Sequence, residues 1–108
     1  MIRDEIAVEL GWEKMPNTWW HREEQRYAAG HPIPDSADWL LEFWERELKG
    51  WSWWRFRRYW FAYRPADGFG SIRFEPDVQD AMRVPDTNNP KADLFALTLA
   101  VLRARKGI

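Results

Sequence analysis

Nine of the 108 residues are tryptophan, and six phenylalanines and three tyrosines accompany them. Each indole combines a large apolar surface with one N–H group that needs an acceptor when it is buried. A chain of this length buries about two-thirds of its unfolded surface, which suffices for one core and not for two. We therefore expect residues 1–108 to form a single domain, with some indoles in the core and others exposed as stacking platforms or interface anchors.

The rest of the composition narrows the class of protein. Hydrophobic residues make up 45% of the chain and charged residues 31%, as in globular proteins. The absence of cysteine excludes a disulfide framework, a cysteine zinc site and a cysteine nucleophile. The N-terminal residues do not resemble a signal peptide, and the longest apolar stretch, 94–102, is too short for a membrane span. We expect a soluble, cytoplasmic protein with no membrane partner.

Three segments have helical patterns. Residues 2–10 carry apolar side chains at helical spacing and are followed by glycine. Residues 35–49 form the clearest amphipathic helix, for which Asp35 is the predicted N-cap. Asn89 followed by Pro90 is typical of a helix start, and the apolar run behind it predicts a helix that is covered on most sides.

Other segments favour strands. Short strands are predicted near residues 18–21, 25–28 and 81–84. The aromatic segment Trp51–Tyr63 predicts one long strand, with a turn at 65–70 and a return strand at 71–75. A helical stripe also fits residues 51–61, but the turn and return strand favour a hairpin. The expected fold class is α+β, with helices packed on a small antiparallel or mixed sheet.

Several short landmarks follow one another in a recognisable order. They are Gly11-Trp12 after the first helix, Trp19-Trp20, Asp35-Ser36-Ala37-Asp38, and Asp86-Thr87 before the helix at 94–105. In this order the chain resembles the phage ABA-sandwich domain family of small phage and prophage proteins. It departs from the family in carrying Phe95-Ala96-Leu97 where an Ala-Ile-Cys-like signature is typical, and in its middle strand, which is richer in Trp and Arg. The resemblance implies a three-layer α/β/α sandwich and a phage origin, hence the cytoplasm of a bacterial host cell, and it implies no catalytic residues.

The sequence contains no recognisable catalytic apparatus. Its two histidines, His21 and His31, lie on either side of a loop region and not at the spacing of a metal site. The serines lack a nucleophile-elbow context, and Gly68-Phe69-Gly70 lacks the rest of a phosphate-binding loop. We therefore predict a non-enzymatic protein with no metal and no cofactor.

The segment 51–64 is the predicted binding site, because it interleaves arginines with aromatic residues. As one strand, neither of its faces is purely apolar, so arginine side chains must reach solvent or a partner. The predicted partner-binding residues are Trp53, Arg55, Arg57, Arg58, Tyr59 and Arg64. The structural alternative is that helices cover the aromatics while the arginines pair with Glu42, Glu45 or Glu75.

We expect a small phage-encoded accessory protein that binds a host or phage protein, with inhibition of a defence system such as a CRISPR effector as one such role. The alternative is a module that binds single-stranded nucleic acid through the same segment. Sixteen basic residues against seventeen acidic give a net charge of −1, which argues against a dedicated nucleic-acid binder. A homodimer formed through an aromatic patch or a free edge strand is a further expectation.

Overall fold

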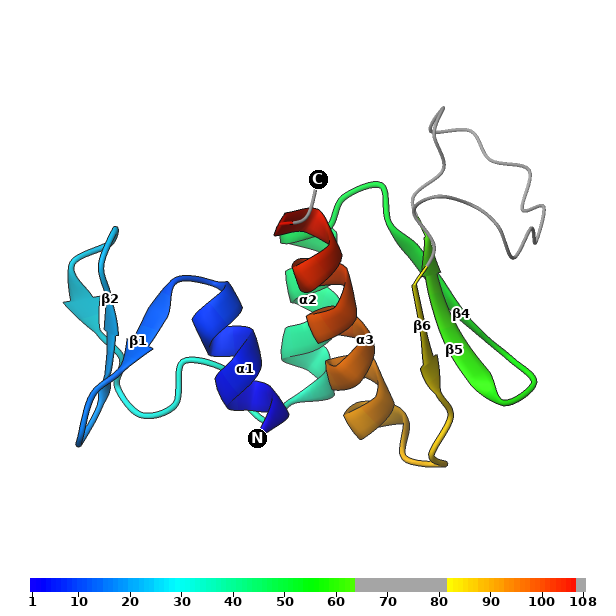
Figure 1. The fold of residues 1–108 in the computed structure, drawn as a ribbon, viewed down its shortest axis with the longest axis horizontal. Helices are drawn as coiled ribbons and strands as arrows, with labels where there is room; N and C mark the ends of the chain where they lie inside the picture. The colour runs from blue at the N-terminus through cyan, green and yellow to red at the C-terminus, as the bar shows by residue number, and fades with distance from the viewer. Residues whose placement is uncertain (64–81, 107–108) are drawn as a thin grey trace.

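A computed structural model describes residues 1–63 and 82–106, in which three helices accompany two three-stranded antiparallel sheets (Figure 1). The elements in chain order are α1 (Ile2–Glu9), β1 (Trp12–Lys14), β2 (Trp19–His21), β3 (Arg26–Tyr27), α2 (Ala37–Glu47), β4 (Ser52–Phe56), β5 (Tyr59–Tyr63), β6 (Met82–Pro85) and α3 (Pro90–Lys106). The predicted α+β class, with helices packed on small antiparallel sheets, is confirmed.

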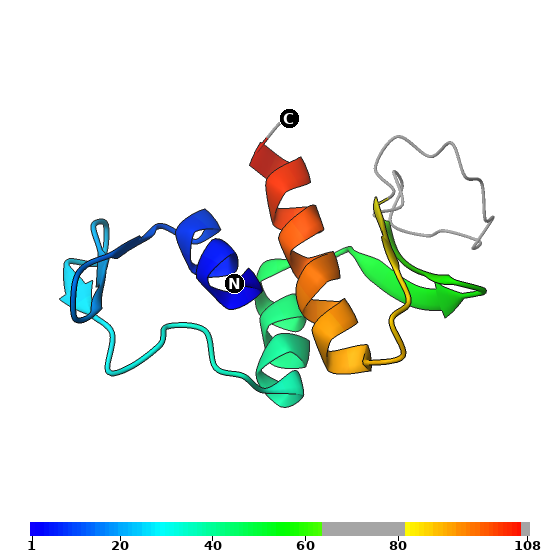
Figure 2. The same cartoon turned by 60° about the horizontal axis from the view of Figure 1, so that its bottom comes forward.

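The helices lie in the middle of the molecule, and the sheets lie at its two ends (Figures 1 and 2). The first sheet has the order β1-β2-β3 and lies beside α1, whereas the second sheet has the order β4-β5-β6 and lies against α3. The molecule is accordingly elongated, with extents of 46 × 30 × 22 Å. The strands form two sheets where the sequence led us to expect one, because each sheet is built from neighbours in the chain and α2 separates the two groups.

The N-cap of helix α2 lies one residue after the predicted cap. Ser36 is the N-cap: its backbone is extended (φ −141°, ψ 126°) and its hydroxyl oxygen accepts a hydrogen bond from the Trp39 N–H at 3.3 Å. The predicted cap, Asp35, instead forms an ion pair with Lys91 of α3, at 3.2 Å. The predicted start of α3 is confirmed, since the Asn89 side chain accepts a hydrogen bond from the Ala92 N–H just ahead of Pro90.

The prediction of one continuous strand over Trp51–Tyr63 is wrong. Strands β4 and β5 pair antiparallel with Phe56 opposite Tyr59, so Arg57 and Arg58 form a two-residue turn in the middle of the segment. The aromatic residues on either side of this turn pair with one another across the two strands, which stabilises the short hairpin. The predicted turn at 65–70 and return strand at 71–75 lie outside the described residues.

Helix α3 forms the centre of the core. Its residues Leu97, Thr98 and Val101 are completely buried, in contact with a cluster to which both sheets and all three helices contribute. Two deeply buried indoles satisfy their N–H groups on this helix: Trp44 donates to the Thr98 hydroxyl at 2.8 Å, and Trp60 donates to the Asp93 carboxylate at 3.0 Å. Besides filling the core, the two indoles therefore form specific hydrogen bonds that fix the position of α3.

The turn from α1 into β1 requires glycine at position 11. Gly11 has a φ of +96°, and a Cβ at this position would lie 3.0 Å from Nε2 of His21. The His21 ring is buried and cannot move aside, because its Nε2 donates to the Leu10 carbonyl at 3.0 Å and its Nδ1 accepts from the Glu24 N–H. We expect Gly11→Ala to lower the free energy of unfolding by about 2 kcal/mol, measured by urea denaturation.

Gly30 supplies the matched control for this substitution. Its φ is also positive, at +102°, but no atom of the described residues beyond its chain neighbours lies within 4 Å of the point that a Cβ would occupy. Gly30→Ala therefore adds backbone strain alone and should cost about 1 kcal/mol. Equal losses for the two variants would contradict the steric role assigned to His21.

Candidate functional site

The second sheet has one face toward the helices and one face away from them. Residues directly opposite each other across the strands share a face, as do alternate residues along a strand. Trp60 and Ala62 are buried in the core, so the inner face also contains their partners in the register: Trp53, Arg55 and Val84. We call the opposite side the outer face; its described side chains include those of Ser52, Trp54, Tyr59, Phe61, Arg83 and Pro85.

Aromatic rings occupy the centre of the outer face. Trp54 and Phe61 stack on each other with ring centroids 5.7 Å apart and an interplanar angle of 18°. The Tyr59 ring lies 6.2 Å from that of Phe61, and the Arg83 guanidinium lies 4.9 Å above the Tyr59 ring. Tyr59 is 36% exposed, and Trp54 and Phe61 are partly exposed, so this cluster is accessible from solvent.

Arginines surround the cluster at the turn and on β6. Arg57 adopts a left-handed backbone with φ +57°, and the Arg58 carbonyl accepts a hydrogen bond from the Asp86 N–H at 2.7 Å. Arg58 and Arg83 are exposed, and neither forms an ion pair with any residue in the described part of the chain. The outer face and its turn therefore combine ring edges with guanidinium groups that face water.

The structure divides the predicted site residues among several places. Trp53 and Arg55 belong to the inner face, where Trp53 is partly buried and Arg55 forms an ion pair with Asp86 at 2.8 Å instead of with the predicted Glu42 or Glu45. The third predicted glutamate, Glu75, lies outside the described residues. Arg57 and Arg58 form the turn, and Tyr59 lies on the outer face. Arg64 lies outside the described residues.

Sequence reasoning missed three residues of the outer face, namely Trp54, Phe61 and Arg83. A signal for the first two was present: the pair Arg57-Arg58 separates two runs rich in aromatics, residues 51–56 and 59–63, as a two-residue turn separates the strands of a hairpin. Arg83 has no such signal in the sequence. It shares the outer face with Phe61 because β6 pairs with β5, and this pairing is seen only in the structure.

A buried carboxylate fixes the second sheet to α3. Asp93 is only 2% exposed, and its carboxylate accepts hydrogen bonds from Trp60 Nε1 at 3.0 Å, the Thr87 N–H at 3.0 Å and the Thr87 hydroxyl at 2.5 Å. Burial by itself raises the pKa of this carboxyl, but the hydrogen bonds from Thr87 and Trp60 together outweigh it and hold the pKa below its usual value. Asp93 is therefore a charged structural group that orients the sheet.

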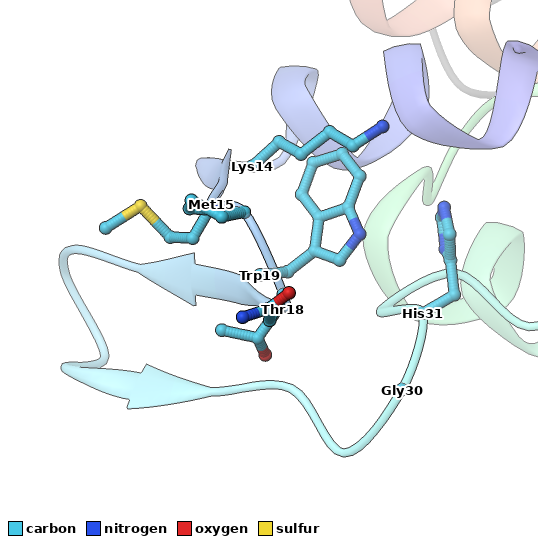
Figure 3. Close-up of a pocket in the computed structure, with 8 residues that line it drawn as sticks. Lys14, Met15, Thr18, Trp19, Gly30 and His31 are labelled. Carbon is cyan, nitrogen blue, oxygen red and sulfur yellow. The ribbon is translucent and has the colours of Figure 1, made fainter.

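A pocket of about 310 Å³ opens beside β2. Here the Lys14 side chain passes over the Trp19 indole, and the His31 ring lies across from the indole (Figure 3). His31 donates from Nε2 to the Asp4 carboxylate at 2.6 Å and accepts at Nδ1 from the Ile33 N–H at 3.0 Å. The hydrogen bond from His31 lowers the pKa of Asp4. Both ring nitrogens of His31 are thus engaged in holding the loop that follows β3.

Hydrogen bonds within the fold hold both histidines in place. His21, like His31, uses both ring nitrogens in hydrogen bonds. Within residues 1–63 and 82–106, no group of three or more His, Asp or Glu side chains is placed to hold a metal ion. A further cleft of about 540 Å³ between α2 and β4 is lined mainly by apolar side chains, among them Trp44, Trp51 and Trp53.

Comparison with known proteins adds no family. No protein-family model, no curated protein and no solved structure matches the chain. The resemblance to phage ABA-sandwich proteins therefore stays a prediction. None of the helices in the described residues has the length and apolar character that a membrane span requires.

Proposed function

We propose that this protein acts by binding another protein through the outer face of the second sheet. The observation that carries the proposal is the solvent-accessible cluster of Trp54, Tyr59 and Phe61 with Arg83 above it. Tryptophan, tyrosine, phenylalanine and arginine are the residues enriched at the centres of protein interfaces. These side chains stand on paired strands and contact one another, which reduces the conformational entropy that they lose when a partner binds.

The orientation of the rings favours a protein partner over nucleic acid. Binding of single strands depends on flat ring faces on which bases stack. The faces of Trp54 and Phe61 are turned toward each other, and the Arg83 guanidinium covers a face of Tyr59. The net charge of −1 also lacks the basic excess typical of nucleic-acid binders. Ring edges of this kind suit apolar side chains of a protein better than bases.

The biological setting belongs to the same proposal. The resemblance to small phage proteins supports a non-enzymatic accessory role in the cytoplasm of a bacterial host. One such accessory role is to inhibit a host defence effector, such as a CRISPR effector, by binding to it through the outer face. The histidines support a role without catalysis, since both use their ring nitrogens in structural hydrogen bonds.

The proposal is tested by capturing proteins from bacterial lysate on the immobilised chain and on its Trp54→Ala variant. Removing an indole from the centre of an interface costs about 2 kcal/mol or more, so capture of the specific partner should weaken at least about tenfold. Quantitative mass spectrometry of the retained proteins measures the difference, and far-UV circular dichroism verifies that the variant is folded.

The matched control is Tyr27→Ala, which removes an aromatic ring that is 63% exposed at the other end of the molecule. This variant should retain the same partner as the unmodified chain. If Trp54→Ala and Tyr27→Ala capture the partner equally well, or if only nucleic acid is retained, the outer face is not the protein-binding site.

A further inference from the structure

We infer that the partner presents an acidic surface to the outer face, with carboxylates placed against Arg58 and Arg83. This inference rests on the proposed function, because it concerns the same face. It goes further by specifying the chemistry of the partner: an aspartate- and glutamate-rich segment that also carries apolar side chains to contact the ring edges.

The first support is the distribution of charge around the second sheet. Its arginines reach solvent, including Arg58, Arg83 and Arg55, whose side chain is 53% exposed. The nearby carboxylates that the structure describes are withdrawn from solvent: the Asp86 side chain is 6% exposed and is engaged by Arg55, and Asp93 is buried beneath its three donors. Among the residues that the structure describes, the charges that a partner meets at this end are therefore mainly positive.

The second support is the chemistry of the guanidinium group. Its planar fork of N–H donors matches a carboxylate in bidentate geometry and is less strongly hydrated than an ammonium group. Arg58 and Arg83 have no ionic partner among the described residues, so binding a carboxylate would not require an internal ion pair to break. Arg83 is also held against the Tyr59 ring, which reduces the entropy lost when it binds.

The third support is the backbone at the tip of the hairpin. Arg57 occupies the first position of a two-residue turn with φ +57°, where glycine or asparagine is favoured. Strained positions of this kind cluster at functional sites. Arg57 and Arg58 are both exposed at this tip.

Phosphates also bind guanidinium groups, so nucleic acid is the competing partner and becomes an outcome of the test. The probe is a fluorescently labelled peptide of alternating glutamate and leucine, compared with oligothymidylate carrying the same label. Fluorescence anisotropy at low salt should show that the acidic peptide binds more tightly than the oligonucleotide, and that its binding weakens as salt is added.

The decisive variant is Arg58→Gln with Arg83→Gln, which keeps both side chains polar and removes both charges. Affinity for the acidic peptide should fall at least about tenfold. The matched control is Arg22→Gln with Arg26→Gln, which removes two exposed arginines near the first sheet and should change the affinity less than about twofold. Equal losses in both double variants, tighter binding of oligothymidylate, or no peptide binding at low salt would overturn the inference.

Capture from lysate separates this inference from the proposed function. If Trp54→Ala loses the partner and Arg58→Gln with Arg83→Gln retains it, the face binds a protein whose surface is not acidic, and only the inference fails. If both variants retain the partner, the outer face does not bind it and the proposed function fails as well.

Discussion

Replacing Asp93 with alanine is expected to lower the free energy of unfolding by about 3 kcal/mol or more. The substitution removes the common acceptor of Trp60 Nε1, the Thr87 N–H and the Thr87 hydroxyl. The Trp60 indole is 7% exposed, so its N–H would have little access to water as a replacement partner. Because domains of this size are stable by only about 5–15 kcal/mol, the loss is large enough to populate the unfolded state under mild denaturing conditions.

Urea denaturation followed by tryptophan fluorescence measures this loss. Asp35→Ala is the matched control, since it removes an aspartate whose ion pair with Lys91 is exposed to solvent and should cost less than about 1 kcal/mol. A comparable loss in the two variants would show that the Asp93 hydrogen bonds do not hold the second sheet to α3.

The pH dependence of stability provides a second readout for Asp93. The pKa of this carboxyl is lowered in the folded protein, so the unfolded chain binds the proton more tightly. The contribution of the ionised Asp93 carboxylate to the free energy of unfolding is therefore fully present above the unfolded pKa of about 3.9. It is lost as the pH falls through the lower folded pKa. The Asp93→Asn variant lacks this carboxyl and should not lose stability by its protonation. The difference in unfolding free energy between the variant and the unmodified chain should therefore narrow below about pH 4.

Replacing Leu97 with alanine is expected to destabilise the fold by about 3 kcal/mol. Leu97 is completely buried in the middle of α3, which packs between α1, α2 and the second sheet. Packing from several directions leaves little freedom for the surroundings to collapse into the cavity, so the cost includes a cavity term as well as the lost burial of the side chain.

Leu41→Ala is the matched control for this substitution. Leu41 is a helical leucine that is 43% exposed, so the same chemical change removes little buried surface and should cost less than about 1 kcal/mol. Midpoints and slopes of urea unfolding give both values. Similar losses at the two positions would contradict the central place of α3 in the core.

The helices could be predicted because their signals are local. Periodic apolar residues mark 2–10, a capping sequence with an amphipathic pattern marks the middle helix, and Asn89-Pro90 marks the start of α3. Each of these signals acts between residues at most a few positions apart, as the hydrogen bonds of a helix do. The boundaries shifted only slightly, as when Ser36 rather than Asp35 caps α2.

The sequence by itself determined that the chain is an α+β protein and that β-structure rich in aromatics and arginine lies within residues 51–63, although it predicted one strand there and the structure has two. Only the tertiary structure decided which side chains share a face. Side chains alternate between the two faces along a strand, and the turn at Arg57-Arg58 places the residues of β5 opposite those of β4 instead of continuing one strand. The outer face and the contact of Asp93 with Trp60 depend on packing between elements far apart in the chain. Such contacts leave no periodic trace in the sequence, since the geometry that brings them together exists only after the elements have assembled.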